Sequence, residues 1–127
     1  MKYIVETNKP FKEALGALLE EIPKHQFGVL HTHDINATLN SKGVPFEKQV
    51  SVLEVCNPKK ANAVLSEDMS LNMVLPCRIS VWEDDGAVKM GTIRPTALIS
   101  ELNDSKALKI AAKEVEDTLI AIIEAAV

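Results

Sequence analysis

The sequence predicts an α+β fold, a two-layer sandwich in which an antiparallel sheet carries two long helices on one face. Residues 10–22 and 106–126 place apolar side chains at helical spacing, which predicts two amphipathic helices. The Asp-Asp-Gly sequence at 84–86 separates two β-rich segments and is typical of a tight hairpin turn, which makes those strands antiparallel. We therefore expect one domain over residues 1–127, ordered strand, helix, four strands and helix, with short helical insertions.

The first strand is expected at residues 3–7, which are rich in β-forming side chains. Asn8 is suited to cap the following helix, and Pro10 suits its first turn, where a missing N–H costs nothing. Pro23 marks the end of this helix. Its apolar stripe consists of Phe11, Ala14, Leu15, Leu18, Leu19 and Ile22.

Residues 27–32 and 49–56 predict the second and third strands, and the third is nearly apolar on both faces. Asp34 is suited to cap a short helix between them, which Gly43 would end. Strands that alternate with helices in this way also fit a parallel, doubly wound sheet. Helices of about two turns are too short for such crossovers, so we favour the antiparallel arrangement.

Asn57 and Pro58 form a typical helix start, with the asparagine as the cap and the proline in the first turn. Residues 68–71 are expected to form a turn. Residues 75–83 and 88–93 then predict the fourth and fifth strands, joined as the hairpin.

The last helix has the clearest helical period in the chain. Pro95 precedes it and opens only a brief helical turn, and Asp104 or Ser105 is the expected cap. Its apolar residues are Leu108, Ala111, Ala112, Val115, Leu119, Ile122 and Ile123.

Composition argues against several classes of function. Lys and Arg number 14 against 18 Asp and Glu, and the net charge of −4 argues against nucleic-acid binding and against docking on acidic membranes. We see no signal-peptide core, no apolar run near the roughly 20 residues of a membrane span, no phosphate-binding glycine loop and no G-x-S-x-G elbow. Two cysteines do not make a disulfide framework. We expect a cytoplasmic protein with free thiols and no cofactor.

An ordered set of short motifs resembles a known family. The set consists of Phe27-Gly28-Val29-Leu30, Asp34-Ile35, Thr38-Leu39, Cys56-Asn57-Pro58, Leu75-Pro76-Cys77 and Glu83-Asp84-Asp85-Gly86. It is similar to the small bacterial and archaeal proteins of domain-of-unknown-function family number 302, over nearly the whole chain. The resemblance implies a two-layer α+β fold and a homodimer, and it implies no known activity.

Cys56, Asn57, Pro58 and Cys77 form the candidate ligand-binding site. Cys56 ends a strand just before a helix start, where unpaired N–H groups favour thiolates and bound anions. Cys77 begins the next strand, so antiparallel pairing of the two strands brings both sulfurs to the same edge of the sheet. Cysteine is also among the most buried residue types, and two structural thiols are the simpler interpretation.

His31 and His33 are the candidate metal ligands. Residues i and i+2 of a strand share a face, and Asp34 lies beside them. A closed site needs about four ligands, however, and no further paired motif supplies them. We therefore interpret the histidines as polar residues at an exposed strand end, expected at the opposite end of the sheet from Cys56.

Glu83, Asp84 and Asp85 resemble paired catalytic carboxylates. They fall at the expected hairpin tip, where acidic residues suit the turn geometry and stay solvated. We therefore interpret them as turn residues.

By alternation, Arg78, Ser80 and Trp82 share one face of their strand. Two long helices can cover only one side of the sheet, and its other side is not fully polar. We expect that second face to form a two-fold homodimer interface.

These observations predict a homodimeric domain that binds a small molecule or serves as an accessory domain, with no catalytic residue assigned. Its pocket is expected between the long helices and the sheet, near Cys56 and Cys77. The alternative is a thiol-dependent enzyme or redox sensor that uses Cys56 with Cys77 as its partner. Close, exposed sulfurs would favour the alternative, and sulfurs sealed in the core would favour a structural role.

Overall fold

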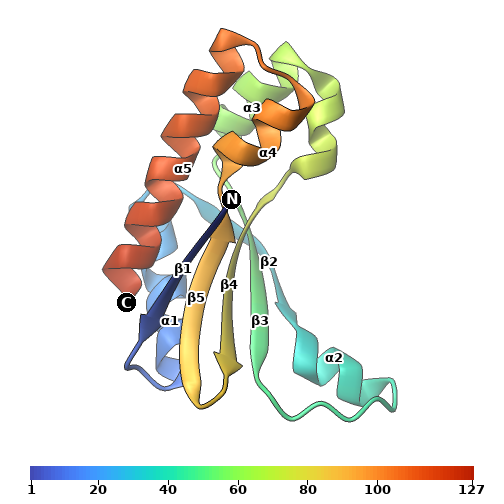
Figure 1. Ribbon diagram of the computed structural model, residues 1–127, viewed down its shortest axis with the longest axis vertical. Helices are drawn as coiled ribbons and strands as arrows, with labels where there is room; N and C mark the ends of the chain where they lie inside the picture. The colour runs from blue at the N-terminus through green and yellow to red at the C-terminus, as the bar shows by residue number, and fades with distance from the viewer.

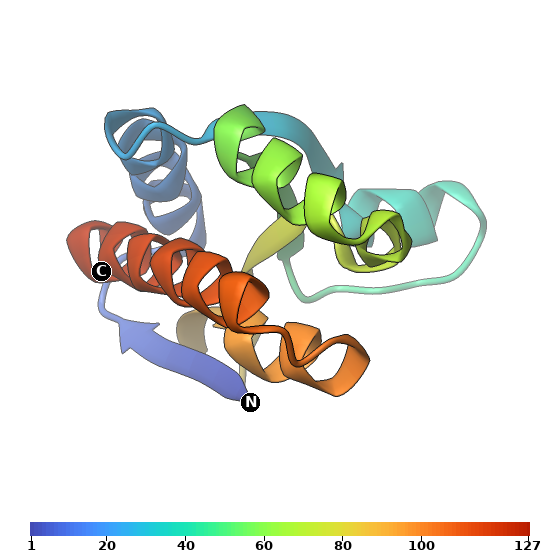
Figure 2. The same cartoon turned by 90° about the horizontal axis from the view of Figure 1, so that it is seen from above.

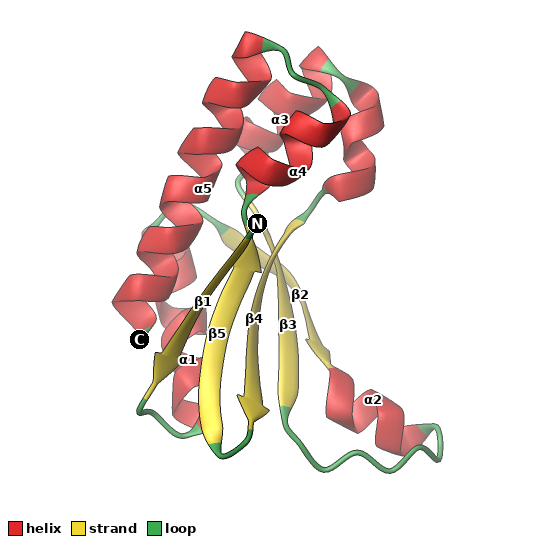
Figure 3. Cartoon of the chain, in the orientation of Figure 1, coloured by secondary structure: helices red, strands yellow, loops and turns green.

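The computed structural model describes residues 1–127 and shows a five-stranded sheet with helices against one of its faces (Figures 1 and 3). In chain order the elements are β1 (Lys2–Thr7), α1 (Phe11–Lys24), β2 (Gly28–Asp34), α2 (Ile35–Ser41), β3 (Val50–Cys56), α3 (Pro58–Glu67), the 3₁₀ helix η1 (Met69–Val74), β4 (Cys77–Asp84), β5 (Ala87–Ile93), α4 (Pro95–Leu102) and α5 (Lys106–Ala126).

All neighbouring strands are antiparallel, in the order β1-β5-β4-β3-β2. β1 and β2 therefore lie at opposite edges, and α1 connects them across the back of the sheet. Asp85 and Gly86 form the tip of the β4–β5 hairpin with φ angles of 51° and 81°, which an Asp-Gly pair accommodates. The antiparallel α+β sandwich is confirmed, and the parallel alternative is wrong.

The core lies between the sheet and the two long helices, α1 and α5, which contact each other on the same side of the sheet (Figure 2). Their apolar stripes meet the inward residues of β3, β4 and β5. Fully buried members of this core include Leu18, Ile22, Leu53, Ile79, Val81, Met90, Leu119 and Ile122. A second, smaller cluster holds α3, η1 and α4 against the first half of α5.

Side-chain caps start most of the helices where the sequence predicts. Asp34 accepts a hydrogen bond from the backbone N–H of Ala37 at 3.1 Å, and Ser105 caps α5 in the same way. The prediction for Asn8 is wrong, because α1 begins at Phe11 and Pro10 occupies the cap position without a side-chain hydrogen bond. Asn8 lies two residues before that cap position, so its side chain does not cap the first free N–H groups.

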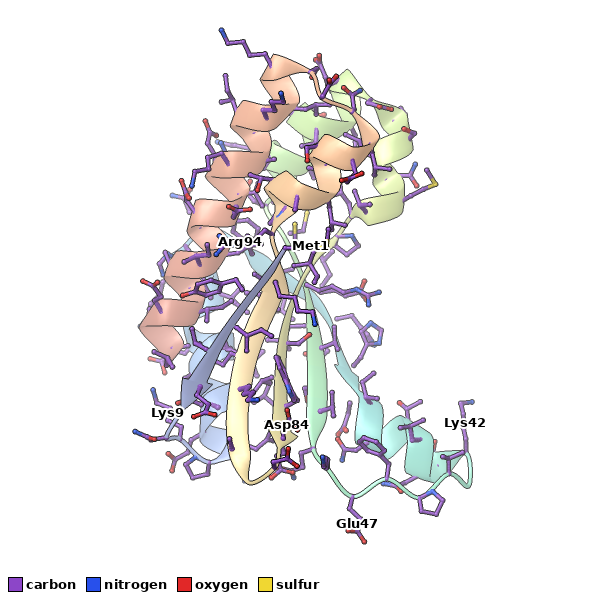
Figure 4. The ribbon with its side chains drawn as sticks, viewed as in Figure 1. Met1, Lys9, Lys42, Glu47, Asp84 and Arg94 are labelled. Atoms are coloured by element: carbon purple, nitrogen blue, oxygen red, sulfur yellow. The ribbon has the colours of Figure 1, made fainter.

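The N-terminus of α4 is capped by a side chain from another helix. Glu116 of α5 is buried and accepts hydrogen bonds from the backbone N–H of Thr96 at 3.2 Å and from its hydroxyl at 2.6 Å. The same carboxylate pairs with Arg94 at 3.5 Å. Arg94 also donates its backbone N–H to the carbonyl of Met1 at 2.8 Å, and the two residues lie together at the upper end of β1 in Figure 4. These contacts join β1, α4 and α5.

The face of the sheet turned away from α1 and α5, here called the open face, has no helix packed over its central strands (Figure 2). α4 lies beyond its upper end in the view of Figure 1. By register, the open face carries Lys2, Ile4, Glu6, His31, His33, Val50, Val52, Glu54, Arg78, Ser80, Trp82, Lys89, Gly91 and Ile93.

Gly91 of the open face lies where β1 leaves no space for a side chain. A Cβ atom at this position would lie 2.7 Å from the backbone oxygen of Tyr3 and 3.4 Å from Cη2 of Trp82. A side chain at residue 91 would therefore collide with the backbone of β1.

None of the helices is both long enough and apolar enough to cross a membrane.

Candidate functional site

Cys56 and Cys77 lie at the same end of the sheet. Val55 and Cys77 are register partners in the β3–β4 pairing, and Cys56 is the last residue of β3. Asn57 accepts a hydrogen bond from the backbone N–H of Lys60 at 3.2 Å, and α3 begins at Pro58. Asn57 and Pro58 therefore serve as the start of α3, as their sequence pattern indicates.

Both thiols are free and half-buried. Burial, with a smaller contribution from the nearby Cys56, raises the pKa of the Cys77 thiol from 9.0 to about 11. Cys77 is therefore protonated at neutral pH, and a protonated thiol is a poor nucleophile. A thiol-dependent reaction would have to use Cys56 as the reacting group.

Cys56 and Cys77 line a common cavity between the end of the sheet, α3 and α5. The cavity measures about 40 Å³, and Asn57 is also part of its lining whereas Pro58 is not. Its other walls are mainly apolar and include Phe27, Val64 and Val115. This volume holds a water molecule, but it falls far below the roughly 300 Å³ or more of a typical organic-ligand pocket.

A larger cavity of about 310 Å³ lies next to the small one, and both are lined by the segment 75–77 and by Pro95 and Ile99. It lies where β3, β4 and β5 meet η1 and α4. Its lining is Glu54, Met73, Val74, Leu75, Pro76, Cys77, Arg78, Thr92, Ile93, Pro95, Leu98 and Ile99. Cys77 is the one residue of the sequence-predicted site that lines this larger cavity.

The charged groups of the larger cavity are Glu54 and Arg78, which are direct register partners on β3 and β4. The Glu54 carboxylate bonds to a third residue, with its Oε1 atom 2.5 Å from Nε2 of His33. This hydrogen bond is the main reason that the pKa of Glu54 is lowered, and the charges of His33, Arg78 and His31 contribute further. Arg78 forms no ion pair and no side-chain hydrogen bond.

His31 and His33 share the open face, with their ring centroids 4.4 Å apart. The sequence predicts them at the opposite end of the sheet from Cys56, and the register places His33, opposite Val52, near that end and His31, opposite Glu54, in the middle of the strand. Asp34 uses its carboxylate to cap α2. The protein contains no group of three or more His, Cys, Asp or Glu side chains that could hold a metal ion.

The acidic residues of the hairpin have structural partners. Glu83 accepts a hydrogen bond from the backbone N–H of Gln49 at 2.7 Å, and Asp84, at the lower tip in Figure 4, pairs with Lys89 at 3.2 Å. These contacts hold the hairpin turn together and attach it to the start of β3, in keeping with the interpretation of these acids as turn residues.

Comparison with known proteins identifies the family. Residues 3–126 match the family model described as "Domain of unknown function DUF302". The chain belongs to the DUF302 family. It is similar to the crystal structure of an "uncharacterized conserved protein DUF302 from Bacillus stearothermophilus", with 32% sequence identity and a TM-score of 0.93 over 99% of this chain and 98% of that one. No curated protein matches the chain. The resemblance indicated by the C-N-P and L-P-C motifs is therefore confirmed.

Of the residues that the sequence of this DUF302 chain predicts for the site, Cys56, Asn57 and Cys77 line the small cavity, and the larger cavity was not predicted. The pattern predicts only a brief helical turn at Pro95, whereas α4 continues to Leu102 and forms one wall of the larger cavity. One available signal was the outward position of Arg78 beside the Leu75-Pro76-Cys77 motif, which places a cation next to an apolar segment.

Proposed function

We propose that this protein is a homodimeric domain that binds a small molecule in the larger cavity. The observation that carries this proposal is the cavity itself, because its 310 Å³ reaches the lower end of the usual range for ligand pockets. Its walls also have the usual chemistry of such a site, with mostly apolar side chains and a few polar groups.

A titration of the full chain with small apolar fragments, followed by the shifts of backbone amide NMR signals, tests this proposal. Fragments that bind in the cavity should shift the signals of residues 75–78 and 92–99. A Leu98→Trp variant should remove these shifts, because Leu98 lines the cavity. The matched control is Leu102→Trp, on the same helix but outside the lining, and it should leave them unchanged. Binding that survives in Leu98→Trp would count against this cavity as the site.

The homodimer part of the proposal is supported by the apolar residues of the open face. Ile4 and Ile93 are 46% and 41% exposed there, beside the half-buried Trp82. No helix covers this row of apolar side chains, and a second copy related by a two-fold axis would bury it.

Light scattering at micromolar concentration tests the dimer. The proposal expects a mass of twice 13.9 kDa. Ile4→Glu, on the open face and outside the cavity lining, should reduce it to the mass of one chain, whereas Ile110→Glu, at an exposed apolar position of α5, should leave the dimer intact. A wild-type protein that scatters as one chain contradicts this part of the proposal.

The proposal includes the cytoplasm as the site of action, because both cysteines are free and a reducing compartment maintains free thiols. The alternative of a thiol-dependent enzyme or redox sensor gains no support from Cys77, whose raised pKa keeps it protonated.

A further inference from the structure

Arg78 lies at the edge of the larger cavity, and its guanidinium forms no ion pair and no side-chain hydrogen bond, although its charge acts on the neighbouring Glu54. In the antiparallel pairing of β3 and β4 it lies directly opposite Glu54, which would be its natural partner. The carboxylate of Glu54 is instead bonded to His33, at 2.5 Å, and His33 lies on β2, the other neighbour of β3 in the sheet. The guanidinium of Arg78 therefore keeps all its donors available.

The other polar side chains of the cavity are already engaged. Thr92 donates its hydroxyl to the backbone oxygen of Arg78 at 2.7 Å, and Glu54 has its bond to His33. The remaining side chains of the lining are apolar, apart from the weakly polar Cys77 thiol and Met73 sulfur. Arg78 is thus the one cation of the cavity and its donors are unused, whereas the only other charged group, Glu54, has its Oε1 atom bonded to His33.

A guanidinium binds a carboxylate well, because its planar donors match the two oxygens in a bidentate pair. An apolar chain attached to that carboxylate would lie against Met73, Leu75 and Leu98 and lose its contact with water. A ligand with an ammonium group would have to share the carboxylate of Glu54 with His33, which already bonds to its Oε1 atom.

We propose that the larger cavity binds a small amphipathic anion, an apolar chain that ends in a carboxylate, and that Arg78 binds the carboxylate. This inference rests on the proposed function, since it names the class of ligand for the same cavity.

Three probes of similar shape test it on the full-length chain: hexanoate, hexanamide and norleucine. Hexanamide lacks the charge, and norleucine adds an ammonium group beside the carboxylate. In NMR titrations we expect hexanoate to bind about tenfold more tightly than hexanamide, the effect of one charge-assisted hydrogen-bonded pair. Norleucine should bind more weakly than hexanoate.

Arg78→Gln should remove the difference between hexanoate and hexanamide and leave the binding of hexanamide unchanged. The matched control is Lys2→Gln, which removes another open-face cation that lies outside the cavity lining. It should preserve the difference. The comparison of probes on the wild-type chain needs no variant, so it stands if Arg78→Gln fails to fold.

Equal binding of hexanoate and hexanamide would overturn this inference and leave the proposed function intact. Tighter binding of norleucine would overturn it in favour of a zwitterionic ligand. If Arg78→Gln changes a wild-type dimer into a single chain, the charge serves the interface and the inference is wrong. Failure of all three probes and of neutral apolar fragments to bind would reject the proposed function as well.

Discussion

Alkaline pH should destabilise this protein through Cys77. The folded structure raises the pKa of this thiol from 9.0 to about 11, mainly by burial. The protonated form is therefore favoured in the folded state, while the unfolded chain begins to ionise near pH 9. The resulting stabilisation is complete below pH 9 and is lost as the pH rises to about 11. At about 1.4 kcal/mol for each pKa unit, the loss amounts to roughly 2.8 kcal/mol in the free energy of unfolding.

Urea denaturation of the wild type and of Cys77→Ala, at a series of pH values across this window, measures that contribution. Other groups of the protein also ionise at high pH, so the informative quantity is the difference in stability between the two proteins. We expect Cys77→Ala to be less stable than the wild type below pH 9, because a half-buried side chain is shortened, and we expect this difference in stability to shrink as the pH rises. Cys56→Ala is the control and should keep most of the alkaline loss. Wild type and Cys77→Ala that lose stability in parallel would refute this account of the thiol.

Other substitutions test contacts of the fold, each by chemical denaturation. Gly91→Ala should destabilise the protein by about 1–3 kcal/mol, because the new Cβ would lie 2.7 Å from a backbone oxygen of β1. Gly16→Ala is the control: nothing lies near its Cβ, and it should stabilise α1 by about 0.5–1 kcal/mol. Equal effects of the two substitutions would contradict the close approach at Gly91. Asn57→Ala should cost about 1 kcal/mol by removing the cap of α3, and no loss would show that the cap is dispensable. Glu116→Ala should cost about 2 kcal/mol of stability, because the first turn of α4 loses its buried hydrogen-bond acceptor. Glu114→Ala, at an exposed position of the same helix, should cost under about 1 kcal/mol. Similar losses would argue against Glu116 as the cap of α4.

Much of the fold follows from local sequence. The long helices have continuous apolar stripes, and the hairpin has a turn sequence that tolerates the positive φ angles of Asp85 and Gly86. The end of α4 does not follow in this way. Its buried residues are only Pro95 and Ile99, too few for a period, and the acceptor at its N-terminus is Glu116, which is distant in the sequence.

The candidate site likewise has one part that follows from local sequence and one part that does not. The proximity of Cys56 and Cys77 follows from antiparallel pairing of two consecutive strands. The bond between His33 and Glu54 depends on a β-bulge, because the register of β2 against β3 shifts by one residue between Val29 and His31. Without that shift His31 would pair with Leu53, and both histidines would turn to the core side of the sheet. No local pattern marks the bulge, so the partner of Glu54 and the free guanidinium of Arg78 could not be predicted.

The bulge has a consequence for how copies of the chain can meet. β2 is an edge strand, and an intact edge offers a regular row of backbone donors and acceptors onto which a strand from another molecule can add. The extra residue at this point, Leu30, interrupts that row and increases the local twist. Side-by-side growth into extended, fibril-like sheets is therefore disfavoured along β2.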